Sequence, residues 1–144
     1  MKLTVSKGDL FELPKNEYVF AHCIATDLHW GAGIAPVMMK EFNAGGRWRN
    51  RADHYNVGDI GIDNSSKGIM VNLFTKGRTS GKPTYDSVRH CLENLKNFMT
   101  TKRLTKLAMP KIGCGLDRLN WNEVESIIND VFKDTDIEIT VKYV

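Results

Sequence analysis

Runs of apolar residues divide this chain into segments of strand length and segments of helix length. Apolar and polar residues alternate over residues 3–5, which predicts a first strand. Residues 18–24 form a nearly continuous apolar run, the pattern of a strand that is covered on both faces. Residues 57–62 and 68–75 predict two further strands, and the polar residues 63–66 predict the turn that joins them.

Three segments carry apolar residues at the spacing of an amphipathic helix. The apolar positions are Ile34, Val37, Met38 and Phe42; Val88, Cys91, Leu92, Leu95, Phe98 and Met99; and Val124, Ile127, Ile128, Val131 and Phe132. Thr84 is placed to cap the second helix, while Asn120 and Glu123 have the spacing of a capping box at the start of the third. Between the first helix and the third strand, residues 43–56 predict a surface loop with one helical turn.

Two short strands complete the pattern, at residues 107–109 and 137–143. Strands that alternate with helices imply an α/β fold, here a three-layer α/β/α sandwich around a mixed central sheet. A length of 144 residues is that of one domain, which is enough to bury about two-thirds of the unfolded surface in a single core. We therefore expect one domain over residues 1–144.

In such sheets, ligands bind at the carboxyl ends of the strands. The loops at residues 9–11, 25–35, 76–83 and 112–118 follow predicted strands, so we expect them to meet at one edge of the sheet.

Composition narrows the class of protein further. Hydrophobic residues at 42% and charged residues at 26% are ordinary globular values and argue against disorder. A net charge of +3 suits an anionic ligand without requiring nucleic acid. Three widely spaced cysteines favour neither a disulfide framework nor a structural zinc site. The chain also lacks a secretory signal and any apolar run long enough to cross a membrane, so we expect a soluble, unexported protein.

The stretch from Met109 to Trp121 carries the strongest chemical signal. An apolar strand stops at a proline, two glycines follow, and a helical pattern then begins, which reads as strand, anion-accepting loop and helix. Gly113 and Gly115 let main-chain N–H groups approach a phosphate closely. Asp117 does not fit a simple phosphate loop, so its carboxylate either bonds a sugar hydroxyl or moves protons.

Four motifs together resemble a known family. They are Lys7-Gly-Asp-Leu10, Gly31-Ala-Gly-Ile-Ala35, Thr75-Lys76 with Lys82-Pro-Thr-Tyr85, and Pro110-Lys-Ile-Gly-Cys-Gly-Leu-Asp-Arg-Leu-Asn-Trp121. Over nearly the whole chain they resemble a macrodomain, of the branch typified by terminal ADP-ribose protein glycohydrolase. The last motif is the most distinctive, because Gly-x-Gly alone is weak evidence.

The resemblance implies a pocket for ADP-ribose. In it, Asp9 would meet the adenine amino group, the loops 31–35 and 112–116 would surround the diphosphate, and the distal ribose would face position 117. The residues it assigns to ligand binding are Asp9, Leu10, His22, Gly31, Ala32, Gly33, Ile34, Ala35, Ile112, Gly113, Cys114, Gly115 and Leu116.

The resemblance also implies the catalytic pair. In this branch a lysine is the nucleophile and an aspartate is its acid/base partner, and these roles fall on Lys76 and Asp117. A lysine attacks an anomeric carbon only as the free amine. Many hydrolytic macrodomains carry asparagines and a diglycine beside the distal ribose, whereas this chain has His22-Cys-Ile-Ala-Thr26 there, which disfavours their water-activating route.

Structural alternatives stand beside these assignments. Asp117 could cap the helix near Trp121, Asp9 could be a turn residue, and Lys76 could be an ordinary solvated loop lysine. Cys114 could be a thiolate nucleophile, although a small buried filler fits better because no histidine lies near it in the sequence.

Two further features leave alternatives open. Trp30 either stacks on a ligand or packs beside the glycine loop. The cluster Arg47-Trp-Arg-Asn-Arg51 is either a solvated basic face, which we favour, or a contact for nucleic acid phosphates. His22 lies in an apolar strand, where a satisfied core or pocket-edge histidine fits better than a metal ligand. The four histidines show no pair at metal-ligand spacing, so we expect no metal. We expect no cofactor either.

Three functions are compatible with the sequence. The leading one is an ADP-ribosyl hydrolase that removes ADP-ribose from acidic side chains or nucleobases; the others are an ADP-ribose 1″-phosphate phosphatase and a non-catalytic ADP-ribose reader. The expected partners are ADP-ribose and protein or DNA that carries it, with no membrane. We expect a monomer in the cytoplasm, or in the nucleus of a eukaryote, and not a secreted protein.

Overall fold

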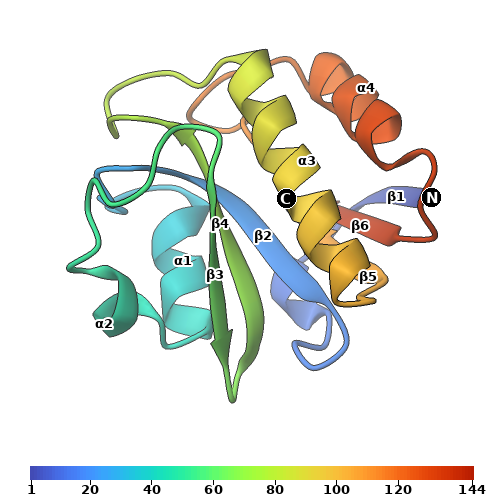
Figure 1. The fold of residues 1–144 in the computed structure, drawn as a ribbon, viewed down its shortest axis with the longest axis horizontal. Helices are drawn as coiled ribbons and strands as arrows, with labels where there is room; N and C mark the ends of the chain where they lie inside the picture. The colour runs from blue at the N-terminus through green and yellow to red at the C-terminus, as the bar shows by residue number, and fades with distance from the viewer.

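The computed structural model describes residues 1–144 and contains one six-stranded sheet (Figure 1). The strands are β1 (Lys2–Lys7), β2 (Val19–Ala25), β3 (Ile60–Ser65), β4 (Gly68–Lys76), β5 (Lys106–Met109) and β6 (Glu138–Tyr143). Their order in the sheet is β1-β6-β5-β2-β4-β3, and only β3 runs antiparallel to its neighbour. The predicted α/β class with a mixed sheet is confirmed.

Helices cover both faces of this sheet. They are α1 (Ile34–Glu41), α2 (Gly45–Trp48), α3 (Tyr85–Thr101) and α4 (Trp121–Phe132), with a short 3-10 helix, η1 (Leu10–Glu12), after β1. Figure 1 shows α3 crossing one face with α4 beside it, and α1 on the opposite face. None of the helices combines the length and the apolar character needed to cross a bilayer.

Two hydrophobic cores result, because successive residues of a strand point to opposite faces. Ala21 of β2 and Val71 of β4 pack in the core beneath α3 and α4. Phe20 and Met70, one position earlier on the same strands, pack in the core beneath α1. Strands covered in this way need apolar residues at nearly every position, which explains the continuous runs in the sequence.

The start of α3 is capped as predicted, whereas the start of α4 is capped only partly as predicted. Thr84 and Ser87 form a reciprocal capping box at α3. The Ser87 N–H donates to the Thr84 hydroxyl oxygen at 3.0 Å, and the Thr84 N–H donates to the Ser87 hydroxyl oxygen at 3.1 Å. Asn120 caps α4 by accepting from the Asn122 N–H at 2.9 Å. The N–H of Asn120 donates to the Tyr85 hydroxyl at 3.1 Å rather than to Glu123, so the expected second half of that box is replaced by a contact between helices.

The position of β3 corrects one expectation. We expected a strand at 57–62 and a turn at 63–66, but β3 runs over Ile60–Ser65. Asp63, which resembles a turn residue, is buried inside the strand. Its carboxylate accepts two hydrogen bonds of 2.7 Å from Arg47 and one of 3.0 Å from the indole N–H of Trp48. A buried carboxylate is stable here because these distant donors satisfy it.

Candidate functional site

A cavity of about 620 Å³ opens where β2, β4 and β5 end. This volume lies within the range of small-molecule sites. Its lining comes from the three strand ends and the loops that follow them: Cys23, Ala25, His29, Gly31, Ala32, Gly33, Ile34, Lys76, Thr79, Ser80, Gly81, Lys82, Pro110, Lys111, Ile112, Gly113, Gly115, Leu116, Asp117 and Arg118. Three of the four loops expected to converge therefore do so, and the fourth, at residues 9–11, lies outside the lining.

Lys76 and Asp117 meet at the wall of this cavity. The ammonium nitrogen Nζ of Lys76 lies 2.6 Å from the carboxylate oxygen Oδ1 of Asp117, and it also donates to the main-chain oxygen of Thr79 at 3.0 Å. Their side chains are only 13% and 17% exposed, so water screens this pair less than it screens a surface ion pair. The two residues predicted as catalytic, 41 positions apart, are thus direct partners.

An irregularity in the sheet helps to aim Lys76. Ile24 pairs with Phe74, but the next residue, Ala25, pairs with Lys76, so Thr75 is left as an extra residue on β4. Such bulges bend a strand and change the direction of the side chains that follow. The bulge therefore lies immediately before the lysine that enters the cavity.

Asp117 belongs to a tight loop that is independent of the helix start. Asn120, and not Asp117, caps α4. Within the loop the N–H of Leu119 donates to the Gly113 carbonyl at 2.8 Å. This removes the alternative in which Asp117 serves only as a helix cap, because its carboxylate is bonded to Lys76 instead.

Two glycine loops face each other across the cavity. Gly33, with φ of +74°, precedes α1, and Gly113, with φ of +70°, lies in the loop after β5. A Cβ on Gly33 would lie 3.3 Å from the side chain of Leu116, which shows how closely the loops approach. Because the first N–H groups of a helix have no partners within it, the start of α1 suits a phosphate at this edge of the cavity.

The predicted ligand-binding residues divide into two groups. The lining of the cavity includes Gly31, Ala32, Gly33, Ile34, Ile112, Gly113, Gly115 and Leu116. It does not include Asp9, Leu10, His22, Ala35 or Cys114. Asp9 caps η1 by accepting from the Phe11 N–H at 2.9 Å, which is the turn role considered above, and Leu10 and Ala35 are buried in the core beneath α1.

His22 does not face the cavity. It is fully buried, and its Nε2 lies 2.6 Å from Oδ1 of Asn72 on the neighbouring strand. Burial lowers the pKa of His22 from 6.5 to about 4, although the hydrogen bond with Asn72 opposes the shift. The ring is therefore neutral near pH 7 and belongs to the polar interior of the sheet rather than to the ligand surface.

Cys114 does not have the features of a thiolate nucleophile. Burial raises the pKa of its thiol, and the nearby Lys111 ammonium only partly opposes this effect. The thiol donates to the Ile112 carbonyl at 3.3 Å. Cys114 is only partly buried and packs against the core beneath α3 and α4, so the buried filler role considered for it fits in part.

The lining also contains residues that were not among the predicted site residues, although the loop at 76–83 was expected to reach this edge of the sheet. The largest group is Thr79, Ser80, Gly81 and Lys82, in the loop after β4. A polar, glycine-containing segment that directly follows Lys76 was the available signal, since such loops carry function more often than strands do. Cys23 is the other notable case, because an apolar strand residue gives no sign that it will form the floor of a cavity.

Asp27 connects two walls of the cavity. Its carboxylate accepts from the Thr79 N–H at 2.8 Å, from the Thr79 hydroxyl at 2.7 Å and from the His29 N–H at 3.2 Å. Partial burial acts to raise the pKa of Asp27, but the hydrogen bonds from Thr79 and His29 outweigh it and the pKa is lowered.

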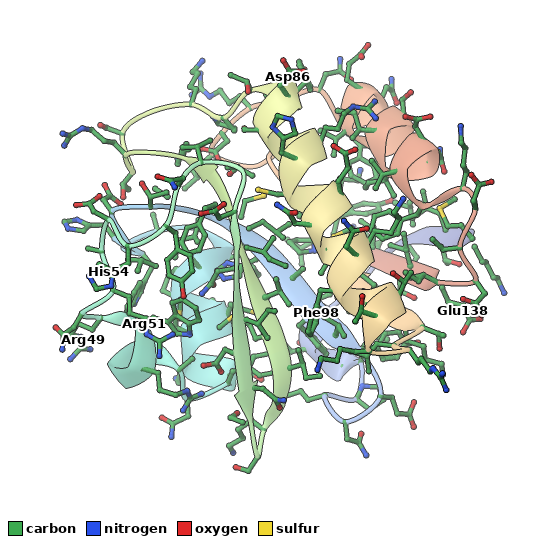
Figure 2. All side chains as sticks on the ribbon, viewed as in Figure 1. Arg49, Arg51, His54, Asp86, Phe98 and Glu138 are labelled. Carbon is green, nitrogen blue, oxygen red and sulfur yellow. The ribbon has the colours of Figure 1, made fainter.

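The basic cluster at residues 47–51 is partly structural. Trp48 is fully buried, Arg47 bonds to Asp63, and the Arg51 guanidinium lies 4.6 Å from the centre of the Trp48 ring. Figure 2 shows Arg49 at the outer edge of the molecule beside α2. The cluster is thus a solvated edge with Trp48 in the core, the interpretation favoured from the sequence.

Trp30 packs toward the start of α2, where a Cβ on Gly45 would lie 3.7 Å from its ring, and it is absent from the cavity lining. No three His, Cys, Asp or Glu side chains come together in an arrangement that could hold a metal ion.

Comparison with known proteins places this geometry in context. The model of the Macro domain family matches residues 22–128. The human protein named ADP-ribose glycohydrolase OARD1 is 41% identical over 140 residues, which cover 97% of this chain and 90% of that protein. A Candida albicans protein named ADP-ribose 1″-phosphate phosphatase is 24% identical over 86% of this chain and 90% of its own length.

The macrodomain of Thermus aquaticus DarG has a similar fold, with a TM-score of 0.84, 20% identity, and coverage of 99% of this chain and 98% of its own.

Proposed function

Since this chain belongs to the Macro domain family, we propose that it is an ADP-ribosyl hydrolase that removes ADP-ribose from acidic side chains or nucleobases, with Lys76 as nucleophile. The membership of the macrodomain family that we inferred from the sequence is confirmed. The observation that supports the mechanism most directly is the 2.6 Å contact between Lys76 and Asp117 at the cavity wall.

The geometry of this pair suggests how the lysine becomes a nucleophile. One proton passed from the Lys76 ammonium to the Asp117 carboxylate converts an ion pair into a free amine and a carboxylic acid. The reaction needs both of these forms at once, an amine that can attack and an acid that can protonate the leaving group. No proton from outside the pair is required.

The first half of the proposed reaction then follows. The Lys76 nitrogen forms a bond to the anomeric carbon of the distal ribose, while the bond from that carbon to the modified side chain or base breaks. Asp117 gives its proton to the departing group, so the products are a sugar–lysine adduct with a positive nitrogen and the Asp117 carboxylate.

Hydrolysis restores the resting pair. Asp117 takes a proton from water as the water oxygen bonds to the anomeric carbon and the lysine nitrogen leaves as the free amine. ADP-ribose is released, and the proton on Asp117 returns to Lys76. The remaining cavity residues bind and orient the ligand: the start of α1 and the loop at Gly113 offer main-chain N–H groups to the diphosphate.

A second candidate is removal of the phosphate from ADP-ribose 1″-phosphate. It is favoured by the similarity to the Candida albicans protein named ADP-ribose 1″-phosphate phosphatase, and it would use the same cavity. A third is a reader that binds ADP-ribose without hydrolysis, which would need the glycine loops but not the Lys76–Asp117 pair. The cytoplasmic location and the monomeric state remain part of the proposal.

A panel of substrates separates the three. Wild type, Lys76→Ala and Asp117→Ala are incubated with ester-linked ADP-ribosylated protein, ADP-ribosylated DNA and ADP-ribose 1″-phosphate. We expect wild type to release ADP-ribose from at least one of the first two, and both variants to lose far more rate than affinity. Binding without release from any substrate would favour the reader. Phosphate release that is unchanged in Lys76→Ala would favour the phosphatase and rule out the lysine route.

A further inference from the structure

The loop that follows β4 is held in place from the other side of the cavity. Thr26 fixes the first residues of this loop. Its N–H donates to the Lys76 carbonyl at 2.9 Å, and its hydroxyl donates to the Gly77 carbonyl at 3.0 Å. Asp27 accounts for the next turn of the loop, because its carboxylate accepts both the N–H and the hydroxyl of Thr79. Two consecutive residues of the β2 loop therefore fix the course of the chain after Lys76.

Thr79 in turn contacts the catalytic lysine. Its carbonyl oxygen accepts from the Lys76 ammonium at 3.0 Å, on the same nitrogen that bonds to Asp117. A continuous series of contacts thus runs from the Asp27 carboxylate through Thr79 to the nitrogen of Lys76.

From this series we propose that Asp27 is a positioning residue, which holds the Thr79 carbonyl where it keeps the Lys76 nitrogen aimed into the cavity. The proposal rests on the hydrolase function proposed above, because it assigns Asp27 a part in the step that Lys76 performs.

The two acceptors of Lys76 differ in what they do during the reaction. Asp117 has to leave the lysine when it protonates the departing group. The Thr79 carbonyl accepts a hydrogen bond from an ammonium and from a free amine alike, because both keep N–H groups. It is therefore the contact that holds the nitrogen while Asp117 turns to the leaving group. A displacement of about 1 Å at such a point is enough to slow a reaction roughly 100-fold.

Asp27 acts on rate rather than on binding, because its side chain is absent from the cavity lining. The Thr79 hydroxyl donates to the Asp27 carboxylate and makes a longer contact of 3.3 Å with the His29 carbonyl, so it is already engaged within the protein. Loss of Asp27 would free the Thr79 turn but leave the glycine loops that face the diphosphate, and so would change kcat more than KM.

The test compares Asp27→Ala with Asp27→Asn. Asparagine has the same shape and can restore both contacts with Thr79, since its oxygen accepts from the Thr79 N–H while its amide donates to the reversed Thr79 hydroxyl. It gives up only the longer bond of 3.2 Å from the His29 N–H. We expect kcat to fall at least ten-fold in Asp27→Ala and to recover to within about three-fold of wild type in Asp27→Asn. KM and the affinity for free ADP-ribose should stay within about two-fold in both.

Asp59→Ala is the matched control. The Asp59 carboxylate also accepts a loop N–H, that of Asn56 at 2.8 Å, and it is absent from the cavity lining. The control removes the same charge and a similar loop contact, and its kcat should match wild type. An unchanged kcat in Asp27→Ala, or an affinity that falls as far as kcat, would overturn the proposal.

A second readout does not depend on turnover. The rate at which a small amine-reactive reagent labels Lys76 is measured by peptide mass spectrometry, and we expect it to change at least three-fold in Asp27→Ala but not in Asp59→Ala. Labelling of Lys76 at the wild-type rate in Asp27→Ala would contradict the positioning role. If wild type releases no ADP-ribose but the labelling changes as expected, the hydrolase function fails and the contact series stands. If wild type is active and Asp27→Ala is unaffected in kcat, the hydrolase function stands and the positioning role fails.

Discussion

The buried imidazole of His22 should make the stability of the protein depend on pH. The native state keeps this ring neutral down to about pH 4, because burial lowers its pKa to that value from the ordinary 6.5. In the unfolded chain the ring is in water and takes up a proton as the pH falls through 6.5. Between these two pH values the unfolded state binds more protons than the native state, so acidification favours unfolding.

The size of the effect follows from the two pKa values. Its full extent is a shift of 2.5, the difference between 6.5 and about 4, which corresponds to about 3 kcal/mol and is reached only below pH 4. Between about pH 7.5 and pH 5, the loss from this one ring is about 2 kcal/mol. Above pH 6.5 the ring is mostly neutral in the unfolded chain as well as in the native state, so raising the pH further hardly changes the free energy of unfolding.

The free energy of unfolding is measured by urea denaturation across this pH range for wild type, His22→Gln and the exposed-surface control His54→Gln. His22→Gln should be less stable at neutral pH, because a flexible side chain replaces a packed ring at a fully buried position. Its stability should nevertheless fall by about 2 kcal/mol less than that of wild type on acidification to about pH 5. The same pH dependence in wild type and His22→Gln would refute the placement of a neutral ring in the core.

Other substitutions test separate parts of the account. Gly113→Ala should destabilise the protein by about 1–2 kcal/mol and weaken ADP-ribose binding, because φ is +70° at this position and a Cβ would lie 2.8 Å from Leu119. Thermal unfolding measures the loss of stability, and calorimetric titration measures the loss of affinity. Unchanged values of both would contradict the role given to this loop. Asp63→Ala should cost roughly 2–3 kcal/mol in urea unfolding, because it leaves the buried indole N–H of Trp48 without a partner. A loss below about 0.5 kcal/mol, the size of an ordinary surface substitution, would show that this carboxylate is not needed.

The elements that could be predicted from the sequence are those whose pattern depends on local chemistry. The apolar stripes of α3 and α4 and the continuous runs of β2 and β4 follow directly from which faces are covered. Thr84 and Asn120 were recognisable as caps because a cap bonds to N–H groups only a few residues away.

The predicted start and end of β3 were wrong because they depend on residues far away in the sequence. Asp63 has the side chain of a turn residue, and only Arg47 and Trp48, about fifteen positions earlier, make it stable inside a strand. No local pattern reveals such a partner.

The candidate site shows the same division. The motif around Asp117 identified the loop, and its resemblance to a family identified Lys76, but the direct contact between these two residues depends on how β4 and β5 lie in the sheet. The resemblance to the family assigned His22 to the ligand pocket. The side chain of His22 is instead buried against Asn72 on the neighbouring strand and is absent from the cavity lining.

The central claim, that Lys76 is the nucleophile, is tested most directly by trapping the adduct. The protein is incubated with its ADP-ribosylated substrate in the presence of cyanoborohydride. This reagent reduces the iminium ion that forms when the ribose ring of the sugar–lysine adduct opens, and the peptide that contains Lys76 is then analysed by mass spectrometry. We predict that Lys76 of wild type carries a reduced ADP-ribose adduct and that Lys76→Ala shows neither adduct nor turnover. Turnover of substrate by wild type with no adduct on Lys76, together with an undiminished rate in Lys76→Ala, would contradict the account.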